Sequence, residues 1–127
     1  MKALTILQPW AWAIVHGQKR IENRTWKTPY RGPLAIHAGQ KLFYFNNGHD
    51  KPCEFPPKEQ LVFGAIIGLC DLIDCLPAES VPANPFKIGP CCWILANVRP
   101  VKPYYCRGQQ LLWMPPSEFL QQHQSRL

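Results

Sequence analysis

Apolar residues in this chain form short runs that proline, glycine and charged residues interrupt. At 33–38 the apolar residues alternate with a less apolar face that carries His37, as in a half-buried strand. The longest run, 61–76, is rich in Val and Ile, and glycines at 64 and 68 predict a bend or a bulge within it. The predicted strands are 3–7, 20–26, 33–38, 61–76, 91–98 and 109–113.

Two short helices are expected beside these strands. Pro9 suits the first helical position, because its missing N–H would be unpaired there, and Gly17 suits a left-handed residue just past the helix end. The helix over 9–16 has a wide apolar arc, so it must be covered on most sides. Ser117 can cap a final helix turn whose Phe119 packs inward together with Leu120.

Proline content narrows the fold class. Fourteen prolines are too many for a helical bundle, since each removes a backbone donor, and they suit short strands joined by turns. Long loops are expected at 40–60, which begins with an aromatic cluster, and at 77–90. The length of 127 residues fits one domain, 1–127. We therefore expect a single α+β domain, mainly β, built as a small barrel with short flanking helices.

The chain is basic, with 14 Lys and Arg against 8 acids and a net charge of +6. Residues 19–31 hold five basic side chains and the single acid Glu22, and 80–117 hold four basic side chains and no acid. If the fold joins these segments, one face is strongly positive and a polyanion is the natural partner. A scattered, solvated distribution of the same charges is the alternative, and the sequence leaves both open.

Six cysteines are an even number, but no signal peptide is recognisable, so a reduced, cytoplasmic protein with cysteine as a small apolar residue is expected. No Cys-x-x-Cys pair occurs, and adjacent Cys91 and Cys92 would point to opposite faces of a strand. A zinc site would need distant residues such as His49 and Cys53, so neither metal nor cofactor is expected. No apolar run is long enough to span a membrane.

Several segments resemble a known family. The run QPWAWAIVHGQKRIENRTW followed by YRGPLAIHAG resembles the N-terminal signature of the ASCH domain, which belongs to the PUA-like superfamily of small β-barrels. GAIIGLCDLID is similar to the family's central strand, and CCWILANVRPV and YYCRGQQLLWMPP are similar to its C-terminal strands. The resemblance extends from about Ala3 to Pro116. It implies a PUA-like barrel with the first helix packed against it and a cleft near the end of that helix.

Lys19, Glu22 and Asp71 form the candidate catalytic set. Asp71 lies in an otherwise apolar row, where burial disfavours the charged carboxylate unless a cation such as Lys19 compensates. Some bacterial ASCH proteins hydrolyse N4-acetylcytidine with a lysine, a threonine three residues later and a glutamate on the central strand. Lys19 matches that lysine, but Glu22 replaces the threonine and Asp71 the glutamate, so Glu22 could serve only as a general base on water. A structural ion pair is the alternative.

Aromatic and basic residues near each other suggest binding instead. Bases stack on aromatic faces while Arg and Lys hold phosphates, although Trp10 and Trp93 equally suit a core. Gln8, His37 and Asn97 could read a base edge or be satisfied polar groups. The candidate binding residues are Gln8, Trp10, Arg24, Trp26, Tyr30, Arg31, His37, Trp93, Asn97 and Arg99.

The sequence therefore favours an RNA- or nucleotide-binding protein with a basic cleft beside Trp10, and ssDNA is a further candidate partner. The alternatives are a small hydrolase acting on a modified nucleoside, a ribonuclease, and a protein-interaction module, since ASCH domains also occur in transcriptional coactivators. Motifs for nucleotide hydrolysis, hydride transfer and zinc proteolysis are missing from the sequence. A pocket in which Lys19 contacts a carboxylate would favour an enzyme, and an open positive groove would favour a binder.

Overall fold

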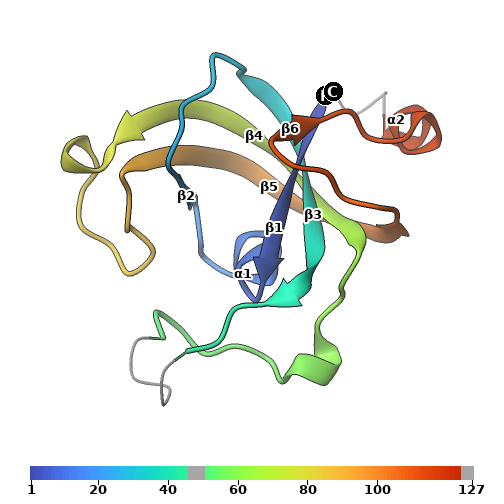
Figure 1. Cartoon of the computed structure of the whole chain (residues 1–127), viewed down its shortest axis with the longest axis horizontal. Coiled ribbons are helices and arrows are strands. Elements are labelled where there is room, and N and C mark those ends of the chain that lie inside the picture. The colour runs from blue at the N-terminus through green and yellow to red at the C-terminus, as the bar shows by residue number, and fades with distance from the viewer. Residues whose placement is uncertain (46–50, 124–127) are drawn as a thin grey trace.

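The computed structural model describes residues 1–45 and 51–123, which form one mixed six-stranded sheet with two short α-helices (Figure 1). The strands are β1 Lys2–Gln8, β2 Ile21–Arg24, β3 Gly32–Leu42, β4 Ala65–Pro77, β5 Cys91–Tyr105 and β6 Leu112–Trp113. The helices are α1 Trp10–Val15 and α2 Ser117–His123, with short 3-10 helices at Lys58–Gln60 and Ala78–Ser80. The prediction of a mainly β fold with short flanking helices is confirmed.

The strand order is β2-β5-β4-β3-β1-β6. β1 and β3 are parallel, and the other neighbours are antiparallel. The sheet curls strongly (Figure 1), yet within the described residues no strand pairing joins β2 to β1 or β6. The predicted barrel is thus incomplete. The sheet is open along a seam where β2, at one edge, approaches β1, the fifth strand in the sheet order.

Side chains on the two faces of β3 enter two different apolar clusters. Leu34 and Ile36 pack on the inner side with α1 and with Trp93 of β5. Ala35, between them in sequence, packs on the outer side, where Phe119 of α2 covers the sheet. Alternate residues of β3 therefore belong to two different cores, one on each face of the sheet. Because both faces of β3 are covered, even His37, on the less apolar phase, is only 2% exposed.

Helix α1 packs against the inner side of the curled sheet, and glycines permit its close packing. Gly17 was predicted to be left-handed, but it is not among the positive-φ residues. A Cβ there would lie 2.8 Å from the Ala13 carbonyl oxygen, so the glycine serves close approach instead. Gly68 of β4 has the same role, because a Cβ at this position would lie 2.5 Å from Cγ2 of Val15 in α1.

Strand β5 continues seven residues beyond the predicted end at Val98. Arg99-Pro100 suggested a stop, because proline cannot donate in a sheet. β2 pairs with Cys91–Ile94, however, so among the described strands the later part of β5 has only β4 beside it, and its other edge tolerates Pro100. The register against β4 shifts near Asn97, whose φ is 54°.

Metal ligands and membrane-spanning helices were not expected. Across 1–45 and 51–123, His, Cys, Asp and Glu nowhere gather in a group of three or more that could hold a metal ion. His49, half of the zinc pair considered from sequence, lies outside the described residues. No helix in these ranges has the length and apolarity needed to cross a membrane.

Cys91 and Cys92 enter different apolar clusters, as predicted for neighbours in a strand.

We expect Gly68→Ala to destabilise the protein by about 1–3 kcal/mol, because the added methyl overlaps Val15. Urea denaturation of the single variants and of Gly68→Ala/Val15→Ala would measure it. The double variant should lose less stability than the sum of the two single losses. Strict additivity would show that the glycine is not needed for helix packing.

Candidate ligand pocket

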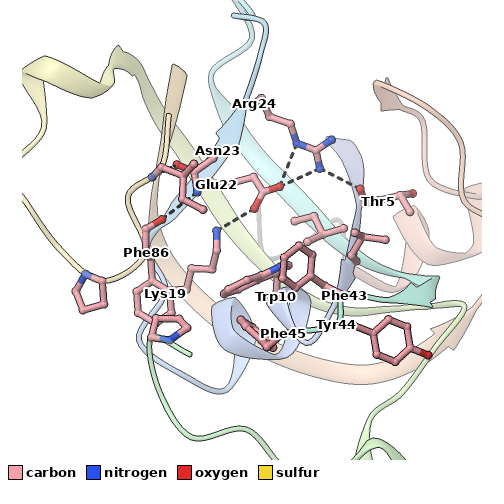
Figure 2. A pocket seen from close by; sticks show the side chains of 15 residues that line it. Thr5, Trp10, Lys19, Glu22, Asn23, Arg24, Phe43, Tyr44, Phe45 and Phe86 are labelled. Carbon is pink, nitrogen blue, oxygen red and sulfur yellow. Dashed lines mark hydrogen bonds and ion pairs between the residues drawn. The ribbon is translucent and has the colours of Figure 1, made fainter. Parts of the chain in front are cut away.

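A pocket of about 790 Å³ opens at the seam between β1 and β2 (Figure 2). One side is formed by β1 and the other by β2, and the start of α1, the segment after β3 and the loop before β5 complete it. The sheet's failure to close therefore creates the space. The described lining residues are Thr5, Ile6, Leu7, Trp10, Lys19, Glu22, Asn23, Arg24, Phe43, Tyr44, Phe45, Pro52, Pro85, Phe86 and Ile88.

A three-residue ionic network forms the polar part of the pocket. Glu22 Oε1 lies 2.9 Å from Lys19 Nζ, and Glu22 Oε2 lies 3.0 Å from Arg24 Nη2 and 3.1 Å from Arg24 Nε. Lys19 also donates to the Ile21 carbonyl. The side chains of Lys19, Glu22 and Arg24 are 3%, 10% and 23% exposed. At such burial each charge needs its partners, since an isolated one would remain uncompensated after losing its water.

The same network bridges the seam. β6 pairs with β1 only at Ala3 and Leu4, which leaves the next part of the β1 edge without a strand partner in the described chain. The Thr5 carbonyl oxygen instead accepts a hydrogen bond from Arg24 Nη2 at 3.1 Å. The Arg24 side chain thus links β2 to β1 at a place where backbone hydrogen bonds between the two strands are missing among the described residues.

Aromatic side chains form the opposite wall (Figure 2). The ring centroid of Trp10 lies 5.6 Å from that of Phe43 and 5.4 Å from that of Phe45. Lys19 Nζ lies 6.0 Å from the Trp10 centroid, so the cation faces the aromatic wall. Tyr44 is 76% exposed and extends this surface outward. The pocket therefore joins flat apolar surfaces to a hydrogen-bonding floor.

Asn23 fixes the third wall. Its Nδ2 donates to the Phe86 carbonyl at 2.9 Å, and its Oδ1 accepts from the backbone amides of Ile88 and Gly89 at 2.9 and 2.8 Å. These bonds attach the loop before β5 to the strand that carries Glu22. The loop residues Phe86 and Ile88 are held against the pocket in this way.

Four of the sequence-predicted site residues meet here: Trp10, Lys19, Glu22 and Arg24. Lys19 and Glu22 would point to opposite sides of a regular strand, and the sequence analysis required Lys19 to lie in the turn before it. Lys19 does precede β2, which begins at Ile21, and its side chain reaches back to Glu22. The contact between this lysine and a carboxylate in a pocket was the feature expected of an enzyme.

The basic cleft is not formed by the predicted residues. Arg31 and Arg99 do not line the pocket; Arg31 pairs with Asp74 at 3.5 Å, and Arg99 Nη1 donates to the Asn97 carbonyl. Among the described lining residues only Lys19, Arg24 and Glu22 are charged, which gives +2 − 1 = +1. The early basic segment and the C-terminal basic segment therefore do not converge beside Trp10.

Asp71 is also separated from the other two candidate catalytic residues. Its Oδ2 accepts a hydrogen bond from Asn97 Nδ2 at 2.7 Å, and it does not line the pocket. β4 places Asp71 opposite Pro33 and Ala96, whereas β2 places Glu22 opposite Trp93. Asp71 and Asn97 thus form a local pair near the β5 irregularity.

The remaining aromatic candidates make contacts outside the pocket. Trp93 is fully buried, and its Nε1 donates to the Trp26 carbonyl at 3.1 Å. Trp26 packs edge-on against Trp93, with ring centroids 4.8 Å apart. The Tyr30 hydroxyl donates to the Pro33 carbonyl, and burial raises the pKa of this phenol. None of the three lines the pocket.

Gln8 and His37 are satisfied buried polar groups. Gln8 accepts from the Trp12 amide and donates to the Val62 carbonyl, so it ties the start of α1 to a loop. Thr5 Oγ1 accepts from Trp113 Nε1, which leaves its own proton for His37 Nδ1, while His37 Nε2 donates to the Cys106 carbonyl. Burial lowers the pKa of His37, in agreement with this neutral tautomer.

Sequence reasoning missed Asn23, Phe86 and the aromatic residues after β3. The cluster at 42–45 was visible as the start of a long loop, but nothing local indicated that it folds over Trp10. Asn23 was regarded only as a poor strand former. Asn23 contributes to the pocket by binding Phe86, which is 63 residues away in sequence. A local sequence pattern does not reveal such a contact.

Comparisons with known proteins agree with this architecture. The family model described as "ASCH domain" matches residues 4–105. Activating signal cointegrator 1 of Homo sapiens and that of Mus musculus are each 39% identical to this chain over 85 residues. These alignments cover 58% of this chain but only 14% of each relative.

Solved structures show the same fold. The crystal structure of ASCH from Zymomonas mobilis has a TM-score of 0.58 at 16% sequence identity, covering 99% of this chain and 94% of that one. A mutant of the Zymomonas mobilis protein has a TM-score of 0.59 at 15% identity, covering 98% and 94%. At these identities the likeness concerns the fold alone.

We expect Glu22→Ala to cost about 3–5 kcal/mol of unfolding free energy, because it leaves the buried Lys19 without its carboxylate. Chemical denaturation would measure the loss. Lys19→Met/Glu22→Leu, which removes both charges of the pair, should recover much of it. A loss below about 1 kcal/mol for Glu22→Ala would be that of a surface ion pair and would contradict the network's structural role.

Asn23→Ala should release the loop before β5, because three hydrogen bonds to its backbone are lost. We expect faster hydrogen exchange at the amides of Ile88 and Gly89. Asn84→Ala is the matched control, since Asn84 bonds only within the loop, to Phe86 N and Pro82 O. Equal effects of the two variants on these amides would show that Asn23 is not the anchor.

Proposed function

The chain belongs to the ASCH domain family, and from this premise we propose that it binds RNA or a nucleotide-like ligand in the pocket between β1 and β2. The observation that carries the proposal is the position of Trp10. Its ring lies in the pocket wall while Lys19, Glu22 and Arg24 lie across from the aromatic cluster (Figure 2). A flat π surface opposite fixed hydrogen-bonding groups suits a nucleobase, which is itself flat and polar at its edge.

Unused hydrogen-bonding capacity supports this assignment. An ammonium group has three N–H donors, and Lys19 uses two of them on Ile21 and Glu22. Within the described residues, Arg24 uses Nε and Nη2, and its Nη1 has no hydrogen-bond partner. Donors that the protein already holds in place can bind carbonyl or ring-nitrogen acceptors of a base without further ordering.

The small charge of the pocket changes the expected mode of binding. With a net +1 among the described lining residues, the pocket cannot neutralise many phosphates at once. Stacking, at about 1–3 kcal/mol per base, then contributes more to selection than counterion release does. We therefore replace the basic cleft of the sequence analysis by a base-reading pocket with weak dependence on salt.

Hydrolysis of a modified nucleoside is the second candidate function, because Lys19 contacts a carboxylate inside the pocket. Glu22 would have to activate a water molecule. Both of its oxygens already accept hydrogen bonds from cations, and Asp71 makes no contribution to the pocket. The arrangement therefore supports binding better than it supports water activation.

Binding can be tested with a short, fluorescein-labelled single-stranded RNA and the matching ssDNA by fluorescence anisotropy at several salt concentrations. Trp10→Ala should weaken RNA binding by about tenfold or more, since it removes a stacking face. Arg31→Ala, which removes a cation outside the pocket, is the control and should leave affinity nearly unchanged.

Two results would contradict the proposal. One is equal weakening by Trp10→Ala and Arg31→Ala, which would place binding on a diffuse charged surface. The other is turnover of N4-acetylcytidine that Lys19→Met abolishes while Lys19→Met remains folded, which would favour the hydrolase.

A further inference from the structure

A second pocket, of about 530 Å³, lies next to the first. The two share three wall residues, Pro52, Pro85 and Phe86. The second pocket then extends along the far side of α1, where Trp12, Gln18 and Arg20 line it. The two pockets are therefore adjacent across these shared residues.

Each of the two pockets is lined by one tryptophan of α1. Trp10 lines the first and Trp12 lines the second, and both are only partly buried. Two residues apart in a helix, they point about 200° apart around its axis, hence to different sides. Phe55 packs edge-on against both, with ring centroids 5.7 Å from Trp10 and 6.1 Å from Trp12. Phe55 thus contacts both tryptophans and links the two aromatic surfaces.

Arg20 is held in place beside Trp12. Its Nη1 donates to the carbonyl of Ile14 in the last turn of α1, at 3.0 Å, and to those of Gly17 and Lys19 just past the helix, at 3.2 and 3.0 Å. In the described parts of the chain its Nε and Nη2 make no further hydrogen bond. Glu54 is the other charged residue among the described lining residues, so these two charges cancel and leave donors and acceptors without net charge. Such a lining favours a base over a phosphate.

We propose that the second pocket receives the base next to the one in the first pocket, so that the site reads two adjacent, splayed nucleotides of one single strand. The inference rests on the proposed function and adds to it a minimal ligand, a dinucleotide. Trp12 supplies the second stacking face, and Arg20 and Glu54 contact the edge of that base. Splaying of neighbouring bases over separate aromatic surfaces is a usual mode of single-strand RNA recognition.

The test compares a mononucleotide with a dinucleoside monophosphate by isothermal titration calorimetry. The wild-type protein should bind the dinucleotide about tenfold more tightly than the mononucleotide. Trp12→Ala should remove the affinity advantage of the dinucleotide and leave the affinity for the mononucleotide unchanged. Trp12→Phe should keep most of that advantage. Trp10→Ala should lower the affinity for both ligands.

A second measurement does not depend on the folding of a variant. Cys53 lines the second pocket and is partly exposed, so the dinucleotide, and not the mononucleotide, should slow its alkylation by N-ethylmaleimide in the wild-type protein. Equal affinities for the two ligands together with unchanged Cys53 alkylation would overturn the second subsite and leave the first pocket's function intact. Failure of the wild-type protein to bind either ligand would overturn the proposed function itself.

Discussion

The carboxylate of Glu22 holds two cations from the turn before β2 and from the end of β2, and this buried network defines the seam of the sheet. Arg24, which Glu22 orients, reaches the β1 backbone across the gap. An additional strand at this position would close the sheet and remove the pocket. Side chains that bridge the gap without filling it allow a stable sheet and an open site to coexist.

The seam also explains why the pocket combines polar and apolar surfaces. Strand edges and the charged side chains of β2 provide directional hydrogen bonding, whereas α1 and the segment after β3 provide aromatic rings. Because the first helix begins immediately after β1, its first residue, Trp10, is placed beside the seam by chain connectivity alone. Trp12, two positions on, is carried to the other side of the helix, and the same short element serves two cavities.

The sequence was informative where structure is local. Alternation identified the strands, and the turn before β2 placed Lys19 correctly relative to Glu22. It failed where the result depends on which distant segments meet. Arg31 lies just before β3 and pairs with Asp74, whereas Arg99 lies in β5 and donates to the Asn97 carbonyl, and net charge carries no information on where each residue lies. Likewise, Pro100 suggested that the strand ends before it. The strand can continue because this part of β5 is not paired with β2, a fact that the sequence does not reveal.

One consequence concerns the length of β2. Glu22 faces the inner cluster side opposite Trp93, while Asn23 faces the side of Cys92 and binds the loop before β5. Together with Lys19 from the preceding turn, these four residues supply both the ionic floor and the loop tether by strict alternation. Insertion or deletion of a single residue would exchange the two faces and remove both at once. The spacing of residues within β2 is therefore as much a part of the pocket as the side chains themselves.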